Sequence, residues 1–115
     1  MALVQITQAQ GRVPVTIFQL QDRVNLGNYQ ELEQTAKDEY NKGMRDLVID
    51  LSQTPSLTSI GIRALMIIHK MLATDNAKHL KLAGLTEPIR EMLQIAGVIG
   101  FIEVYPSVDE AVASF

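Results

Sequence analysis

The sequence predicts an α/β fold with a mixed, mostly parallel sheet, an N-terminal β-hairpin and about four helices. Segments of strand and helix character alternate from residue 46 to the C-terminus, and two β-branched runs flank Gly11 near the N-terminus. Strands that alternate with helices need crossover connections, which make consecutive strands parallel. The 115 residues, of which 47% are hydrophobic, suit one domain with one core over residues 1–115.

The opening hairpin is predicted from residues 3–7 and 13–20, which are short runs rich in β-branched side chains. Gly11 lies in the turn between them. Pro14 has no amide proton to donate, so it belongs on an edge strand or at the start of a strand. We therefore expect the hairpin at one side of the sheet.

A first helix is expected over residues 28–42, followed by the central strand. Asn28 and Glu31 have the spacing of a capping box, and Gly43 is typical of a helix C-terminus. Residues 46–52 then form an apolar run with little alternation. That pattern is typical of a strand covered on both faces.

Helices and strands then alternate. Residues 59–73 and 88–96 are predicted helices, residues 80–84 and 101–105 are predicted strands, and Ser107 with Glu110 predicts the cap of a last helix. Helical spacing assigns these side chains to the buried faces of the two longer helices: Ile60, Ala64, Ile67, Ile68, Met71, Leu72, Ile89, Met92, Leu93 and Ala96.

Composition excludes several classes of function. The chain has no cysteine and a formal net charge of −3, so disulfides are excluded and a phosphate backbone is disfavoured as a partner. No signal peptide is visible at the N-terminus. The apolar stretch over residues 60–72 is interrupted by charges and is shorter than the roughly 20 residues that span a bilayer. We expect a cytoplasmic protein that binds no nucleic acid and does not insert into a membrane.

No catalytic, metal or cofactor site is predicted. His69 and His79 are ten residues apart, without an acidic ligand at a metal-binding spacing. Residues 97–100 lead into a strand, whereas a phosphate-binding loop opens a helix. The carboxylates are scattered over strand ends and helix starts, where turns and helix dipoles explain them. We therefore predict that the chain is not an enzyme and needs no cofactor.

One connection stands out, between the central strand and the second helix. It carries several hydroxyl groups and leaves the strand at its carboxyl end, the edge where open α/β sheets bind ligands and partners. Thr58 or Ser59 is placed to cap the second helix. A cap is compatible with contact to a partner.

These residues resemble a known family. An apolar strand ends in Asp50-Leu51-Ser52, a four-residue loop follows, and Leu57-Thr58-Ser59-Ile60-Gly61 then leads into an apolar helix. This arrangement is similar to the motif of STAS domains of the anti-sigma factor antagonist type. The likeness extends over nearly the whole chain and implies a STAS-like fold. It also implies a regulatory module that binds other proteins.

In that family a loop serine is phosphorylated by a partner kinase that is also an anti-sigma factor, and the phosphate breaks the complex. Thr58 stands where the family has aspartate, and Ile60 stands where the family has its second serine, often the phosphoacceptor. Ser59 and Gly61 match the family, and Asn25 replaces a second aspartate. The resemblance therefore implies Ser59 as the candidate phosphoacceptor, with Thr58 as its alternative.

Two mechanisms stay open: Ser59 is modified, or the loop is a permanent contact surface without phosphorylation. The departures favour the second slightly. The implied partner is an anti-sigma factor with serine kinase activity, or a related cytoplasmic regulator, and a homodimer is compatible with the sequence. The alternative function is a small STAS subunit of an ABC-type lipid transporter that regulates its ATPase. The implied partner-binding residues are Pro55, Ser56, Leu57, Thr58, Ser59, Ile60, Gly61, Arg63 and Asn25.

Overall fold

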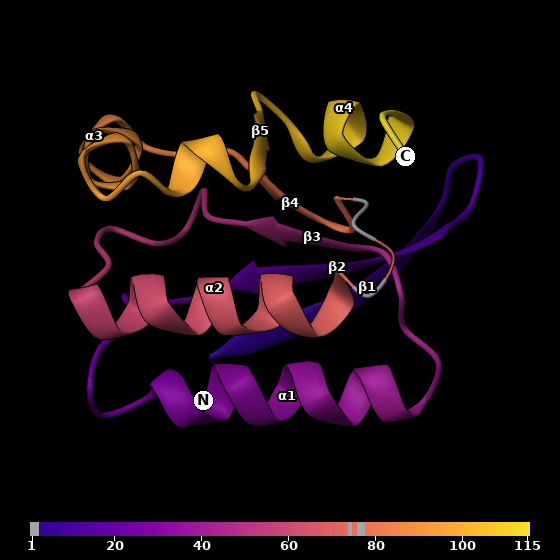
Figure 1. Cartoon of the computed structure of the whole chain (residues 1–115), viewed down its shortest axis with the longest axis horizontal. Coiled ribbons are helices and arrows are strands. Elements are labelled where there is room, and N and C mark those ends of the chain that lie inside the picture. Colours follow the sequence, from indigo (N-terminus) through magenta and orange to yellow (C-terminus); the bar gives the residue numbers. More distant parts are fainter. Residues whose placement is uncertain (1–2, 74, 76–77) are drawn as a thin grey trace.

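Five strands form one sheet in the order β1-β2-β3-β4-β5 (Figure 1). The computed structural model describes residues 3–73, 75 and 78–115. β1 pairs antiparallel with β2 and every later neighbour is parallel, which confirms the predicted fold class. The strands are β1 (Val4–Gln10), β2 (Pro14–Leu20), β3 (Leu47–Asp50), β4 (Leu80–Ala83) and β5 (Glu103–Tyr105). The helices are α1 (Tyr29–Asn41), α2 (Ser59–Leu72), α3 (Glu87–Ile95) and α4 (Val108–Ala113), with a 3-10 turn η1 (Val98–Gly100).

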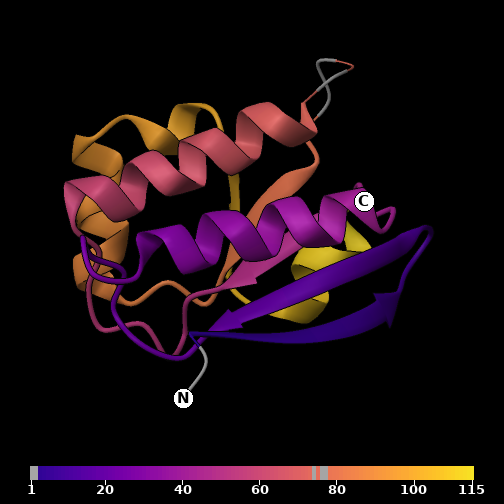
Figure 2. The same cartoon turned by 90° about the horizontal axis from the view of Figure 1, so that it is seen from below.

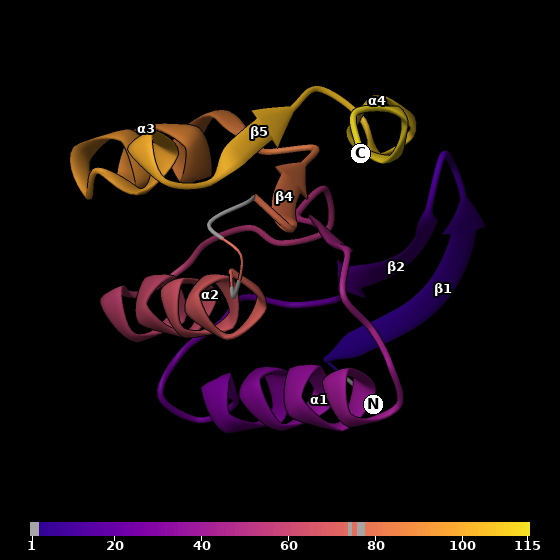
Figure 3. The ribbon, with the colours of Figure 1, turned by 45° about the vertical axis from the view of Figure 1, so that its right-hand side comes forward.

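Helices cover both faces of the sheet. α1 and α2 lie on one face and α4 on the other (Figure 3). Leu47 and Ile49 of β3 join the large apolar cluster with α1, α2 and α3, whereas Val48 joins the smaller cluster beneath α4. Because successive side chains of a strand point to opposite faces, β3 is buried on both, as expected for the central strand.

The predicted capping box of α1 is wrong. The Asn28 side chain accepts a hydrogen bond from the Asn25 amide and donates one to the Arg23 carbonyl, both at 2.8 Å. The Glu31 carboxylate instead accepts from the amide of Leu3 at 2.6 Å. Both side chains therefore tie other segments to the start of the helix. Gly43 ends the helix as predicted, with φ of +115°, a conformation that glycine adopts without strain.

The buried helical faces differ in part from the predicted ones. The buried face of α2 includes Gly61 and Leu65 beside Ala64, Ile68 and Leu72, whereas the predicted Ile60 and Ile67 are only half-buried. Helical periodicity locates an apolar stripe to within about one residue position, and packing against the neighbouring elements decides its centre.

Two expectations near the C-terminal end of α3 are wrong. Ala96 is exposed at the C-cap of α3, beyond Leu93, which is the last buried residue of the helix. The last strand begins at Glu103, later than predicted, because η1 precedes it and leaves Phe101 57% exposed. The final cap is as predicted, since the Ser107 hydroxyl accepts from the Glu110 amide at 3.2 Å.

Candidate functional site

Two loops meet at the carboxyl edge of β2 and β3. Val24, between β2 and α1, forms a parallel bridge with Leu57, just before α2. The Val24 amide donates to the Ser56 carbonyl at 3.4 Å, and the Thr58 amide donates to the Val24 carbonyl at 3.1 Å. Thr54 is buried, and its hydroxyl donates to the Leu20 carbonyl at 3.4 Å. The connection into α2 is therefore held against the sheet.

Thr58 is the N-cap of α2. Its hydroxyl accepts from the Gly61 amide at 3.4 Å and donates to the Val24 carbonyl at 3.2 Å. Gly61 is required for this approach, because a Cβ atom there would lie 3.0 Å from the Val24 carbonyl oxygen and 3.1 Å from the Val24 Cβ. The Thr58 hydroxyl therefore has a structural role at the start of the helix.

Ser59 is the first residue of α2 and is exposed. Within the part of the chain that the structure describes, no hydrogen bond of its hydroxyl to another residue is seen. Arg63 follows one turn later and Lys70 two turns after that, and both are exposed. With 3.6 residues per turn these three side chains share the outward face of α2.

The other predicted contact residues divide by burial. Pro55 is exposed and Ser56, Ile60 and Asn25 are half-buried, whereas Leu57 packs in the core. The Asn25 side chain accepts from the Gly27 amide at 2.8 Å, so it shapes the turn beside Val24. The structure brings these residues together at one edge, and their contact with a partner stays a prediction.

The carboxylate at the end of β3 is structural. Asp50 is buried, and its carboxylate accepts from the Gln19 amide group at 3.2 Å and from the Ser52 amide at 2.9 Å. Gly84 passes so close that a Cβ atom there would lie 2.9 Å from the same carboxylate. Asp50 thus fixes where the loop leaves the strand.

An apolar groove between α2 and α3 adjoins this edge. Its volume is about 400 Å³, and its lining residues are Ile62, Pro88, Glu91, Met92, Ile95 and Ala96. Ile95 is 85% exposed. The sequence contained a signal for this exposed apolar side chain, because Ile95 falls outside the buried face predicted for the helix over residues 88–96.

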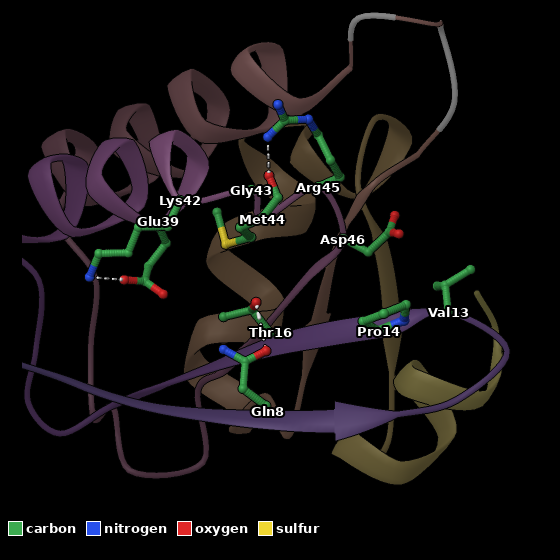
Figure 4. Close-up of a pocket in the computed structure, with 10 residues that line it drawn as sticks. All are labelled: Gln8, Val13, Pro14, Thr16, Glu39, Lys42, Gly43, Met44, Arg45 and Asp46. Carbon is green, nitrogen blue, oxygen red and sulfur yellow. Dashed lines mark hydrogen bonds and ion pairs between the residues drawn. The ribbon is translucent and has the colours of Figure 1, made fainter.

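A larger hollow of about 530 Å³ lies at the opposite edge, beside the segment that precedes β3 (Figure 4). Its charged groups already have partners. Lys42 pairs with Glu39 at 3.2 Å, and the Arg45 guanidinium donates to the Met44 carbonyl at 2.7 Å. Lys42 and Arg45 are therefore already engaged by groups of the same chain.

His79 has two acidic neighbours that its sequence spacing did not suggest. Its Nδ1 lies 2.6 Å from an Asp46 carboxylate oxygen and its Nε2 lies 2.8 Å from Asp75. The hydrogen bond to Asp46, with that to Asp75, raises the pKa of His79 in spite of burial. The ring stands between the two carboxylates. Among residues 3–73, 75 and 78–115, no group of three or more His, Cys, Asp or Glu side chains is arranged to hold a metal ion.

Fold and site together define a small α/β domain with an exposed hydroxyl at the start of a helix. A family model for the STAS domain matches residues 6–111. The Bordetella bronchiseptica protein BtrV, described as an anti-sigma factor antagonist, is 31% identical over 96 residues, covering 84% of this chain and 82% of BtrV. The chain belongs to the STAS domain family of the anti-sigma factor antagonist type.

Solved structures share this fold. A Thermotoga maritima protein described as an anti-sigma factor antagonist superposes with a TM-score of 0.87 at 19% identity, covering 96% of this chain and 92% of that one. A sulfate transporter family protein from Wolinella succinogenes gives 0.74 at 18% identity, covering 87% and 83%. The same fold therefore occurs in a protein described as an anti-sigma factor antagonist and in one described as a sulfate transporter family protein. None of the helices described in this chain is long and apolar enough to cross a membrane.

Proposed function

We propose that this chain acts as one cytoplasmic regulatory domain that docks an anti-sigma factor with serine kinase activity. The docking surface comprises residues 55–61, Asn25 and the outward face of α2 with Arg63 and Lys70; we call it the α2 surface. The observation that carries the proposal is the exposed Ser59 hydroxyl at the start of α2, on a chain of the anti-sigma factor antagonist type.

Ser59 is a better phosphoacceptor than Thr58. The Thr58 hydroxyl is engaged by the Val24 carbonyl and the Gly61 amide, so phosphorylation there would remove the cap of α2. The Ser59 hydroxyl can be modified without the loss of any contact that the structure records for it. This difference supports the first of the two mechanisms, in which phosphate switches the α2 surface.

The surroundings of Ser59 suit a phosphate group. The first turn of α2 carries no acidic side chain, and the amides of a helix N-terminus favour negative charge. Arg63 lies at the i+4 position, where it can pair with the phosphate. The modified helix would remain folded. The added charge of about −2 would repel an apolar or acidic partner face.

The test combines binding and phosphoryl transfer. The purified chain is mixed with each anti-sigma kinase encoded in the same genome, and affinity is measured by calorimetry. The mass of the chain is then recorded after ATP is added. We expect one kinase to bind and to add a single phosphate to wild type and to the Ser52→Ala control, in which another exposed serine is removed. Ser59→Ala should bind but gain no mass. Absence of binding to every kinase contradicts the proposal, whereas binding without any mass change supports the permanent contact surface.

A second candidate is a STAS subunit of a membrane transporter, such as an ABC-type lipid transporter. The observation that favours it is the shared fold with the sulfate transporter family protein. In that case the α2 surface would contact an ATPase. Stable copurification with a transporter ATPase, together with no affinity for any kinase, would support this candidate over the first.

A further inference from the structure

The outer edge of β1 has no strand beside it in the sheet order. The Gln21 amide donates to the Leu3 carbonyl, and the β1–β2 register pairs Thr7 with Ile17. Because hydrogen-bonded and non-hydrogen-bonded pairs alternate in an antiparallel ladder, residues 3, 5, 7 and 9 face β2. The main-chain groups of residues 4, 6, 8 and 10 therefore point outward. In Figure 2 this strand forms the outer margin of the ribbon.

The two edges of the sheet differ in their protection. β5 has only three residues and begins with Glu103, and short or charged edge strands resist pairing. β1 has seven residues, Val-Gln-Ile-Thr-Gln-Ala-Gln, without a charge or a proline. Four of these side chains in succession, residues 5–8, are exposed. β1 thus lacks the usual features that prevent edge-to-edge pairing.

We propose that β1 pairs with β1 of a second copy of this chain, antiparallel and about a two-fold axis at Thr7, to form a continuous ten-stranded sheet. The outward groups of residues 4, 6, 8 and 10 must meet the same groups of the second copy. Registers centred on Ile6, Thr7 or Gln8 satisfy this condition. Only the register centred on Thr7 pairs all seven residues of both strands.

Side-chain chemistry fits a self-pairing strand. In this register Thr7 stands opposite the second copy's Thr7, and Ile6 stands opposite the second copy's Gln8. Threonine pairs are favourable across strands, and like charges directly opposite are not. The chain has a net charge of −3, yet none of it lies on β1. The paired strands would therefore place no like charges opposite each other.

The dimer leaves the α2 surface accessible. β1 and α2 lie apart both in Figure 2 and in Figure 3, which view the ribbon from different directions. Pairing of two seven-residue strands buries much less than the roughly 1,600 Å² of a standard interface. We therefore expect a weak dimer whose population rises with concentration.

A single-cysteine cross-link tests the register, since the natural chain has no cysteine. Thr7 would form a non-hydrogen-bonded pair with its copy, with Cα atoms about 4.5 Å apart, inside the disulfide range of about 4.4–6.8 Å. Thr7→Cys should give a disulfide-linked dimer on mild oxidation. Gln5→Cys, equally on β1 and exposed, should not, because the two residues would be about 13 Å apart at 3.3 Å per residue. Equal cross-linking of the two variants overturns the register.

Charge exchange tests the dimer itself by sedimentation. Thr7→Lys and Thr7→Glu should each sediment as monomers, and an equimolar mixture of the two should restore the dimer. Gln94→Lys adds the same charge on α3 and should dimerise like wild type. A wild-type chain that stays monomeric at millimolar concentration, or a dimer that Thr7→Lys leaves unchanged, overturns the proposal.

Discussion

The Thr58 hydroxyl lies 3.2 Å from the Val24 carbonyl oxygen, so one side chain both caps α2 and joins it to the loop after β2. We expect Thr58→Ala to lower the free energy of unfolding by about 1–2 kcal/mol, the usual cost of a lost N-cap. Urea unfolding measures this. Thr58→Ser keeps the hydroxyl and should remain near wild type; equal losses in both variants would contradict the capping role.

Gly61→Ala should destabilise the chain although alanine is the better helix former. The helix propensity of alanine gains about 1 kcal/mol, but the new Cβ would lie 3.0 Å from the Val24 carbonyl oxygen. The two loops would have to separate, and we expect a net loss of about 1–3 kcal/mol. Gly100→Ala is the control, because a Cβ there meets no atom within 4 Å. A Gly61→Ala variant as stable as wild type would show that the loops yield easily.

Ser59→Asp should separate stability from binding. The aspartate adds a negative charge to a first turn of α2 that has none, and we expect a gain of about 0.3–1 kcal/mol in the free energy of unfolding. The same charge should weaken binding of the anti-sigma factor. Calorimetric binding and thermal unfolding are compared with Ser59→Ala, which should bind like wild type. If Ser59→Asp is more stable and still binds like wild type, Ser59 is not part of the α2 surface.

The stability contribution of His79 should depend on pH. Its hydrogen bond to Asp46 raises its pKa above the ordinary 6.5, so the folded chain holds the proton more tightly than the unfolded chain. The contribution is complete below pH 6.5 and is lost as the pH rises through the raised pKa. The loss of stability caused by His79→Gln should therefore be largest below pH 6.5 and should shrink as the pH rises above 6.5.

His69 is a control, because the pH dependence of its stability contribution should have the opposite sign to that of His79. Burial, with Lys78 and Lys70, lowers the pKa of His69. Its contribution is therefore present above pH 6.5 and is lost as the pH falls through the lowered pKa. His69→Gln should therefore have its larger effect above pH 6.5. A loss in His79→Gln that is the same above and below pH 6.5 would contradict the ion pair with Asp46.

Lys81 should anchor α4 to the sheet. It is 5% exposed, and its ammonium group lies 2.7 Å from the Ser114 hydroxyl and 3.1 Å from the Ser114 carbonyl oxygen. Lys81→Met keeps the apolar stem and removes the donors, which should cost about 1–2 kcal/mol and speed hydrogen exchange in α4. Lys42→Met removes an exposed lysine with one ion pair and should cost less than about 0.5 kcal/mol. Unchanged exchange in α4 would contradict the anchor.

Sequence patterns predicted the element order, the hairpin at the sheet margin and the buried central strand, because these follow from local periodicity and turn chemistry. They also located the connection before α2. They assigned Asn28 and Glu31 to a capping box that does not form, since Glu31 binds the Leu3 amide instead. A contact between residues 28 positions apart has no local signal.

By itself, the sequence determined the fold class, the family and the hydroxyl-rich helix start at Thr58 and Ser59. Only the tertiary structure distinguished the two hydroxyls, because Thr58 is engaged by Val24, which lies 34 positions away. It also paired His79 with Asp46 and left the edge of β1 open. Each of these depends on which segments meet in space, and long-range packing decides that.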